Sequence, residues 1–231
     1  SLEQRKNFAG LPAILNFTAA GNTLRLGVLV TQIPVCVSNT YNHLVLYGGS
    51  TKTMAAAFTI VGNLTISSTT TILNAAGFSF SVGGNWTNSS NNNVNNLGTV
   101  TFNGAGTQTI SRTTGTERFN IIDVSTTGTV LLACSLRVDG DFFLNSGTLD
   151  VSASNHVIDF RGPGFYDNAT FNARFGTFLL RGTGPQTLDG FSSTSFWNIT
   201  LNNAAGATVS FTKNLNNLLT ITLGNFDTGF F

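Results

Sequence analysis

The feature that most constrains this chain is an internal repeat, in which several strings return at an offset of 77 or 78. The string GTVTFNGAGTQTI at 98–110 returns as GTFLLRGTGPQTL at 176–188, an offset of 78. A second string, RFNIIDV at 118–124, matches SFWNITL at 195–201 and TYNHLVL at 40–46. A repeat of this length predicts a solenoid, in which each unit buries its apolar residues against its neighbours.

The anchors divide the chain into three units, at approximately 1–78, 79–156 and 157–231. Within a unit, short stretches alternate apolar and polar residues, as in TVTF at 99–102 and VIDF at 157–160. This period of two is the signature of a β-strand with one buried side. The stretches recur about every 20 residues, and Gly and Asn, which accept the positive φ of tight corners, separate them.

A step of about 20 residues is the size of one coil of a right-handed parallel β-helix. The sequence therefore predicts an all-β chain, with four coils in each unit and about twelve coils in one continuous solenoid over 1–231. We expect Phe102 and Ile122 to point into its core. The alternative is an array of tandem β-sandwich domains, which requires antiparallel strands joined by hairpins.

The composition excludes two classes of partner. Charged residues make up 9% of the chain and the formal net charge is +1, so there is no clustered basic surface for nucleic acid. The longest apolar run, near 28–37, is interrupted by Thr31, Gln32 and Pro34, so we expect no membrane insertion. The polar remainder is rich in Thr, Ser and Asn, which predicts an uncharged, hydrogen-bonding outer surface.

Two cysteines, Cys36 and Cys134, are too few for a disulfide framework. Their separation corresponds to about five coils, or about 24 Å along the axis, which is beyond the reach of a disulfide bond. We therefore predict two free, buried thiols.

The motifs VGGNWTN at 82–88, GTVTFNGAGTQTI at 98–110 and SFWNITLNN at 195–203 resemble the repetitive segments of very large secreted surface proteins of Bacteroidota. Such segments are similar to the β-helices of filamentous haemagglutinin and are commonly exported by type IX secretion. The resemblance extends over most of the chain and is clearest over 58–224. It implies an extracellular or cell-surface adhesin or stalk, and no site residue carries over from it.

The acidic residues Asp139, Asp141 and Asp159 are the one cluster that merits examination as a catalytic site. Asp139 and Asp159 are one coil apart, so their carboxylates could stack about 5 Å from each other, a spacing used by glycosidases. The simpler interpretation is a ladder of surface ion pairs with Arg137, Arg161 and Arg181. We favour the ladder, and we expect no catalytic residues, no metal site and no cofactor.

Surface contacts are expected at Trp86 and in the Asn-rich stretch, at Asn91, Asn92 and Asn93, because loops on a rigid scaffold often carry binding. Five aromatic side chains can stack on sugar rings if exposed, although aromatics that recur at one position of a repeat more often stack in the core. They are Phe8, Trp86, Phe165, Tyr166 and Trp197.

The sequence thus predicts a non-enzymatic structural or adhesive stalk segment of an extracellular protein. The alternatives are a carbohydrate-binding module and a polysaccharide-degrading β-helix enzyme. The expected partners are the rest of a longer polypeptide and glycans or other cell-surface material. The motif at 145–149 returns at 222–226, and in the second unit another coil follows it, so we expect the native polypeptide to continue beyond Phe231.

Overall fold

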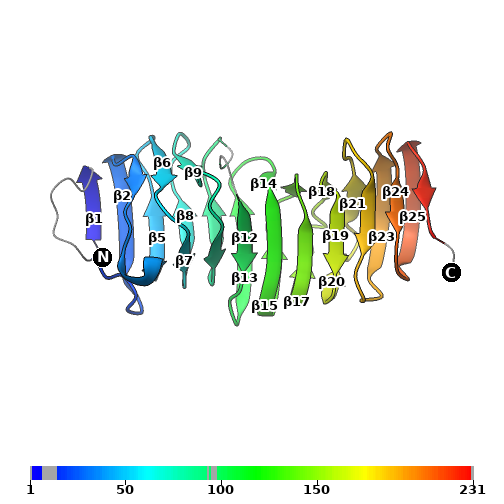
Figure 1. The fold of residues 1–231 in the computed structure, drawn as a ribbon, viewed down its shortest axis with the longest axis horizontal. Helices are drawn as coiled ribbons and strands as arrows, with labels where there is room; N and C mark the ends of the chain where they lie inside the picture. Colours follow the sequence, from blue (N-terminus) through cyan, green and yellow to red (C-terminus); the bar gives the residue numbers. More distant parts are fainter. Residues whose placement is uncertain (1, 7–14, 93, 95–97, 230–231) are drawn as a thin grey trace.

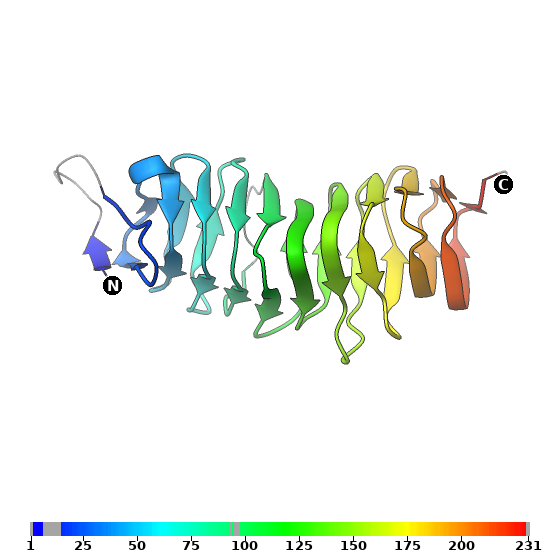
Figure 2. The ribbon, with the colours of Figure 1, turned by 90° about the horizontal axis from the view of Figure 1, so that it is seen from below.

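The computed structural model describes residues 2–6, 15–92, 94 and 98–229 and shows a rod of stacked β-strands (Figures 1 and 2). The two termini lie at opposite ends of the rod (Figure 1). Every strand pairing among the described residues is parallel. The chain therefore winds in one direction and places each turn on the preceding one.

Each turn crosses three faces, which the chain visits in the order face 1, face 2, face 3. Face 1 consists of β1 (Leu2–Lys6), β2 (Thr23–Leu29), β5 (His43–Leu46), β8 (Leu64–Ile66), β11 (Trp86–Asn88), β13 (Thr107–Arg112) and β20 (Thr170–Asn172). Face 2 consists of β3 (Gln32–Ile33), β6 (Thr51–Met54), β9 (Ile72–Asn74), β14 (Glu117–Phe119), β16 (Leu136–Val138), β18 (Ile158–Phe160) and β21 (Thr177–Leu180).

Face 3 consists of β4 (Thr40–Tyr41), β7 (Phe58–Ile60), β10 (Phe80–Val82), β12 (Thr99–Phe102), β19 (Gly164–Asp167), β22 (Gln186–Asp189), β24 (Ala207–Val209) and β26 (Phe226–Asp227). Four longer strands bend round a corner and belong to two faces. They are β15 (Ile121–Leu132) and β17 (Phe142–Asp150), from face 3 to face 1, and β23 (Ser195–Asn202) and β25 (Asn214–Leu223), from face 1 to face 2. A short 3-10 turn, η1 (Val37–Asn39), precedes β4.

The rod has about ten turns, close to the predicted twelve, and the prediction of a parallel β-helix is confirmed. The turns differ in length because their corners differ. Leu131 pairs with Asp150, at a sequence offset of 19, whereas Trp86 pairs with Ile110, at an offset of 24. The strands remain short and regular, and the corners absorb these differences.

One apolar core runs along the axis. Alternate residues of each strand point inward, and Phe102 and Ile122 are fully buried, as predicted. Inward rings contact each other from turn to turn in two stacks, which are Phe17, Tyr41, Phe58, Phe80, Trp86, Phe102 and Phe119 in the first half, and Phe142, Phe160, Phe165, Phe171, Phe178 and Phe196 in the second. Ring-to-ring contact adds to the stability that comes from removing these large side chains from water.

The repeated string encodes a buried glutamine that fastens one turn to the next. Gln108 accepts a hydrogen bond from the Gly104 N–H at 2.7 Å and donates to the Val82 and Gly84 carbonyls at 2.7 and 2.9 Å. A side chain at Gly104 would collide with the Gly83 carbonyl oxygen, 2.0 Å from an added Cβ. Glycine is therefore required at this corner.

One repeat later in the sequence, Gln186 makes the same three contacts. It accepts from the Gly182 N–H at 2.9 Å and donates to the Phe160 and Gly162 carbonyls at 3.1 and 3.0 Å. All four residues follow their counterparts at the same offset of 78. The repeated sequence therefore forms the same hydrogen bonds in both places.

The repeat does not correspond to a whole number of turns. Three turns after Val100 the chain reaches Phe165, and four turns after it reaches Leu188, whereas the repeat partner of Val100 is Phe178. Val100 lies on face 3 and Phe178 on face 2. The expectation of four coils per unit is therefore wrong, because a unit ends one face short of its fourth turn. Equivalent residues of successive units consequently lie on different faces of the rod.

Candidate functional site

The acidic residues singled out from the sequence form ion pairs. Asp159 pairs in register with Arg137, so the predicted stack of Asp159 on Asp139 does not form. Asp139 contacts Arg137 at 2.7 Å and also Arg118. Asp159 contacts Arg161 at 2.8 Å and Arg181 at 2.7 Å. The ion-pair ladder is confirmed, and each of the two carboxylates lies between guanidinium groups instead of facing another carboxylate.

The prediction of a surface contact at Trp86 is wrong. Trp86 is 0% exposed and its ring lies 4.9 Å from Phe119, between centroids, and 6.2 Å from Phe80. The alternation of β11 decides this orientation, because Trp86 and Asn88 point inward and Thr87 points outward. The side chain stacks in the core and is inaccessible to a partner.

The Asn-rich stretch is partly at the surface. Asn91 and Asn92 are exposed, whereas Asn93 lies outside the described residues. Asn88 and Ser90 are buried and Val94 returns to the core. The described part of this stretch is therefore held against the rod and does not bulge away from it.

A buried polar cluster lies beneath this corner. The Glu117 carboxylate accepts hydrogen bonds from Asn88 Nδ2 at 3.0 and 3.2 Å and lies 3.6 Å from Arg112. Arg112 also donates to the Asn92 carbonyl at 3.2 Å and so connects the surface corner to the buried carboxylate. Burial raises the pKa of Glu117 to about 7, although the Arg112 charge and the Asn88 hydrogen bonds oppose the shift.

Sequence reasoning did not find this cluster. Glu117 occupies an inward position of a three-residue strand, where an apolar residue is the rule, and nothing in the sequence places Asn88 beside it.

Cys134 lies near Glu117, and burial together with the Glu117 charge raises the pKa of its thiol to about 11. Both Cys36 and Cys134 are free and buried, as predicted.

A second buried pair, Asp167 and Lys213, connects the last turns of the rod. The Lys213 amine contacts Asp167 and donates to the Gly190 and Ser192 carbonyls at 3.1 and 2.8 Å. Burial raises the pKa of Asp167 to about 6, against the effect of the Lys213 hydrogen bond. The pair spans three successive turns and fastens them at one corner.

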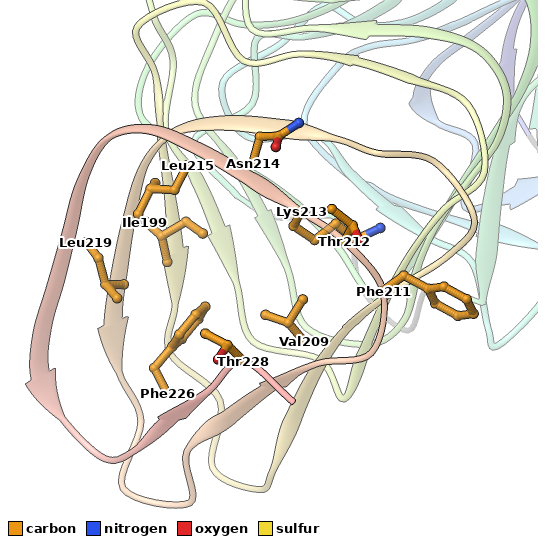
Figure 3. A pocket seen from close by; sticks show the side chains of 10 residues that line it. All are labelled: Ile199, Val209, Phe211, Thr212, Lys213, Asn214, Leu215, Leu219, Phe226 and Thr228. Carbon is orange, nitrogen blue, oxygen red and sulfur yellow. The ribbon is translucent and has the colours of Figure 1, made fainter. Parts of the chain in front are cut away.

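Lys213 also borders a cavity of about 290 Å³ in the last described turn (Figure 3). Its walls are mainly inward apolar side chains, among them Ile199, Val209, Leu219 and Phe226, whereas Phe211 points away from this group (Figure 3). The cavity continues the axial core. It therefore resembles uncovered core more than a shaped ligand site.

Outward aromatic side chains occur where the sequence has aromatic doublets. Neighbouring residues of a strand point to opposite faces, so one member of each doublet must point outward. Phe142, Phe165 and Phe196 are buried, and their neighbours Phe143, Tyr166 and Trp197 lie at the surface. The aromatic doublets are therefore a signal in the sequence from which these outward positions can be predicted.

The outward rings form pairs between turns. The Phe143 and Tyr166 centroids are 5.0 Å apart with ring planes 10° from parallel. Phe175 meets Trp197 edge-on at 4.8 Å, and Phe191, which is 83% exposed, meets Phe211 at 5.2 Å. Of the aromatics named from the sequence, Tyr166 and Trp197 reach the surface, Phe165 and Trp86 do not, and Phe8 lies outside the described residues.

Comparison with protein-family models, with curated proteins and with solved structures finds no match to this chain. No helix in the described part of the chain is long and apolar enough to cross a membrane. Among those same residues, no group of three His, Cys, Asp or Glu side chains is arranged to hold a metal ion. The candidate functional surface is therefore the outer surface of the second half, where the exposed aromatic pairs and ion pairs lie.

Proposed function

We propose that this chain is a structural and adhesive rod segment of a large extracellular surface protein, of the kind that filamentous-haemagglutinin-like β-helices form. The observation that carries the proposal is the continuity of the rod. The parallel ladders of face 1 connect each turn to the next from Leu2 to Asn214. The face 3 ladder is likewise continuous from β4 to β26, so a tension along the axis is shared among backbone hydrogen bonds on at least two faces.

Two further features favour a rod over an enzyme. Asp139 and Asp159, the one candidate acid pair, are engaged by arginines and do not face each other. The outward positions of the first half are mainly Thr, Ser and Asn, which stay hydrated without attracting a charged partner. We therefore propose that the chain is not an enzyme and that it acts through its shape and surface.

Pulling a single molecule from residues near its two ends tests the mechanical role. Because about 21 residues form one turn, each turn that peels away should lengthen the tether by about 70 Å. A rod that bears load turn by turn gives a series of such steps. A single collapse of the whole chain at the lowest measurable force would contradict the proposal.

A carbohydrate-binding role is the second candidate, and the outward aromatic pairs favour it. Partly exposed rings on a rigid sheet give a sugar a preformed surface to stack on, at little cost in side-chain entropy. A glycan array separates this role from a purely mechanical one. Assaying reducing ends after incubation with polysaccharides separates it from hydrolysis, and release of reducing ends would contradict the non-enzymatic proposal.

A further inference from the structure

The Phe143–Tyr166 pair is the centre of a short outward column on face 3. The register places Asp123 beside Phe143, Phe143 beside Tyr166, and Tyr166 beside Asp189 on four consecutive turns. The two rings are nearly parallel, so each has a second face turned towards the neighbouring turn. A carboxylate therefore follows the aromatic pair at either end of the column.

Gly164 makes room for the Tyr166 ring. A Cβ at Gly164 would lie 2.4 Å from the ring, which shows that the ring lies directly over this glycine. The Gly164 N–H donates to Asp141 Oδ1 at 3.2 Å, so a third carboxylate lies beside the same glycine. Burial and the negative charges of Asp141 and Asp189 raise the pKa of the Tyr166 phenol, in agreement with this proximity.

These three carboxylates differ from the ion-paired aspartates of the rod in the charge of their partners. The hydrogen bonds to Asp123 come from Ser125, Asn145 and Thr101, and those to Asp141 and Asp189 come from the glycine N–H groups of Gly164 and Gly190. Among the described residues, the ion pairs of aspartate involve Asp139, Asp150, Asp159 and Asp167 instead. In the part of the chain that the structure describes, none of these three carboxylates forms an ion pair, and the Lys213 amine, which donates to the Gly190 carbonyl next to Asp189, is paired with Asp167.

The physics of this arrangement favours a cationic ligand. The face of an aromatic ring is negative and attracts an ammonium group, and a nearby carboxylate strengthens the attraction. Hydroxyl and amide side chains at Thr101, Ser125 and Asn145 lie around Asp123 and can exchange hydrogen bonds with sugar hydroxyls. A saccharide that bears amino groups uses both features, whereas a lysine side chain uses only the charge.

We propose that this surface, the aromatic–acidic platform (Asp123, Asp141, Phe143, Tyr166 and Asp189), binds glycans with free amino groups, such as oligomers of glucosamine. The inference deepens the carbohydrate-binding role proposed above and is independent of the mechanical one. The platform spans four turns, so a ligand of several sugar units along the axis matches it better than a single sugar.

Isothermal titration of the full chain with the hexamer of glucosamine tests the proposal in mildly acidic buffer, where the amines are protonated. The matched probe is the N-acetylated hexamer, which has the same backbone without charge. We expect the amino hexamer to bind about tenfold more tightly than the N-acetylated one, with an advantage that declines as salt is added.

The variants Tyr166→Ala and Asp189→Asn should each weaken binding of the amino hexamer by several-fold, whereas Tyr166→Phe should retain it. Phe78→Ala is the matched control, because it removes an exposed ring in the first half of the rod, away from the platform and from the outward ring pairs. Each variant is checked by its melting curve, and these outward substitutions should leave it close to that of the wild type.

Equal binding of the two hexamers would overturn the role of the carboxylates, because stacking on an uncharged surface would explain equal affinities. Binding of a lysine-rich peptide but not of the amino hexamer would overturn the assignment to glycans. Absence of binding, or equal loss in Phe78→Ala and Tyr166→Ala, would overturn the platform itself. The pulling experiment is unaffected by these outcomes, so failure of the platform and failure of the rod are distinguishable.

Discussion

Two stretches of the rod differ in their chemistry although they share one architecture. Residues 53–111 contain no Lys, Arg, Asp or Glu, whereas residues 112–189 contain fourteen. In both stretches the face 3 strands alternate in the same way, with Val100 and Phe102 buried in the first and Ile122 and Val124 buried directly beside them in the second. The parallel winding therefore depends on apolar alternation and corner residues, and it does not require charges.

The difference identifies what the charges of the second stretch do. Some are buried and fasten corners, as Glu117 does with Arg112. Others point outward in ion pairs, as Asp159 does beneath Arg161 and Arg181, which cover most of its side chain. The aromatic doublets, each with one half-buried outward ring, lie in and just after the same stretch. We infer that the first stretch is a plain spacer and that the second carries the surface chemistry. Four measurements test this difference between the two stretches.

The largest effect is expected from a charge in the common core. Phe102→Asp in the uncharged stretch and Ile122→Asp in the charged one should each lower the free energy of unfolding by several kcal/mol, because both bury an unpaired carboxylate. Urea titration followed by circular dichroism measures the loss. The outward substitution Thr59→Asp is the control and should cost less than about 1 kcal/mol. If the two core variants differed greatly, the stretches would not share one mode of stabilisation.

The buried carboxylate of Glu117 should give the charged stretch a pH dependence that the uncharged stretch lacks. Its folded-state pKa is raised from 4.5 to about 7, so the folded chain holds this proton between those values when the unfolded chain has lost it. Stability from this group is fully present below pH 4.5 and declines as pH rises to about 7. The decline is at most about 3 kcal/mol, since one pKa unit corresponds to about 1.4 kcal/mol.

Unfolding titrations of the wild type and Glu117→Gln across this range measure the difference. Glutamine keeps the shape and a hydrogen-bonding oxygen for Asn88 and does not titrate in this range. We expect the wild type to lose stability relative to the variant as pH rises from 4.5 to 7. A constant difference across the range would contradict the raised pKa.

The two glutamines compare one corner motif in two settings. Gln108→Leu and Gln186→Leu each leave one carbonyl (Gly84 or Gly162) and one N–H of the corner unpaired, which should cost about 1–3 kcal/mol at each site. Similar losses are expected from the three shared contacts, and Gln186→Leu also loses the hydrogen bond that Gln186 accepts from Asn203 Nδ2 at 3.0 Å. Thr109→Val and Thr187→Val, at the adjacent outward positions, serve as controls. A loss of stability at only one glutamine would show that the same hydrogen bonds contribute differently to stability at the two corners.

The smallest effect is expected from the outer ion pairs. Asp159→Asn removes the partner of Arg161 and Arg181 and should lower stability by at most about 1 kcal/mol, with less effect in high salt. Thermal unfolding at low and high salt measures it. A loss of several kcal/mol would show that these charges hold the rod together, against the interpretation that they belong to its surface.

The local pattern determined much of this protein from the sequence alone. Alternation within a strand predicts which side chains are buried, and it was sufficient for Phe102 and Ile122. Applied to the aromatic doublets, the same rule places Phe143 and Tyr166 outside, next to buried Phe142 and Phe165. The separation of Cys36 from Cys134 was likewise sufficient to predict free thiols. Each of these depends only on a strand's period of two or on the approximate length of a turn.

Only the tertiary structure decided which residues meet between turns. The turns are unequal in length, so the sequence does not show that Asp159 lies beside Arg137 rather than Asp139. For the same reason it did not show that the repeat ends one face short of four turns, nor that Glu117 and Asn88 meet inside a corner. A contact between turns depends on the summed lengths of the corners that separate its residues. The corners vary in length without changing which side chains face the core, because only a one-residue shift within a strand reverses them.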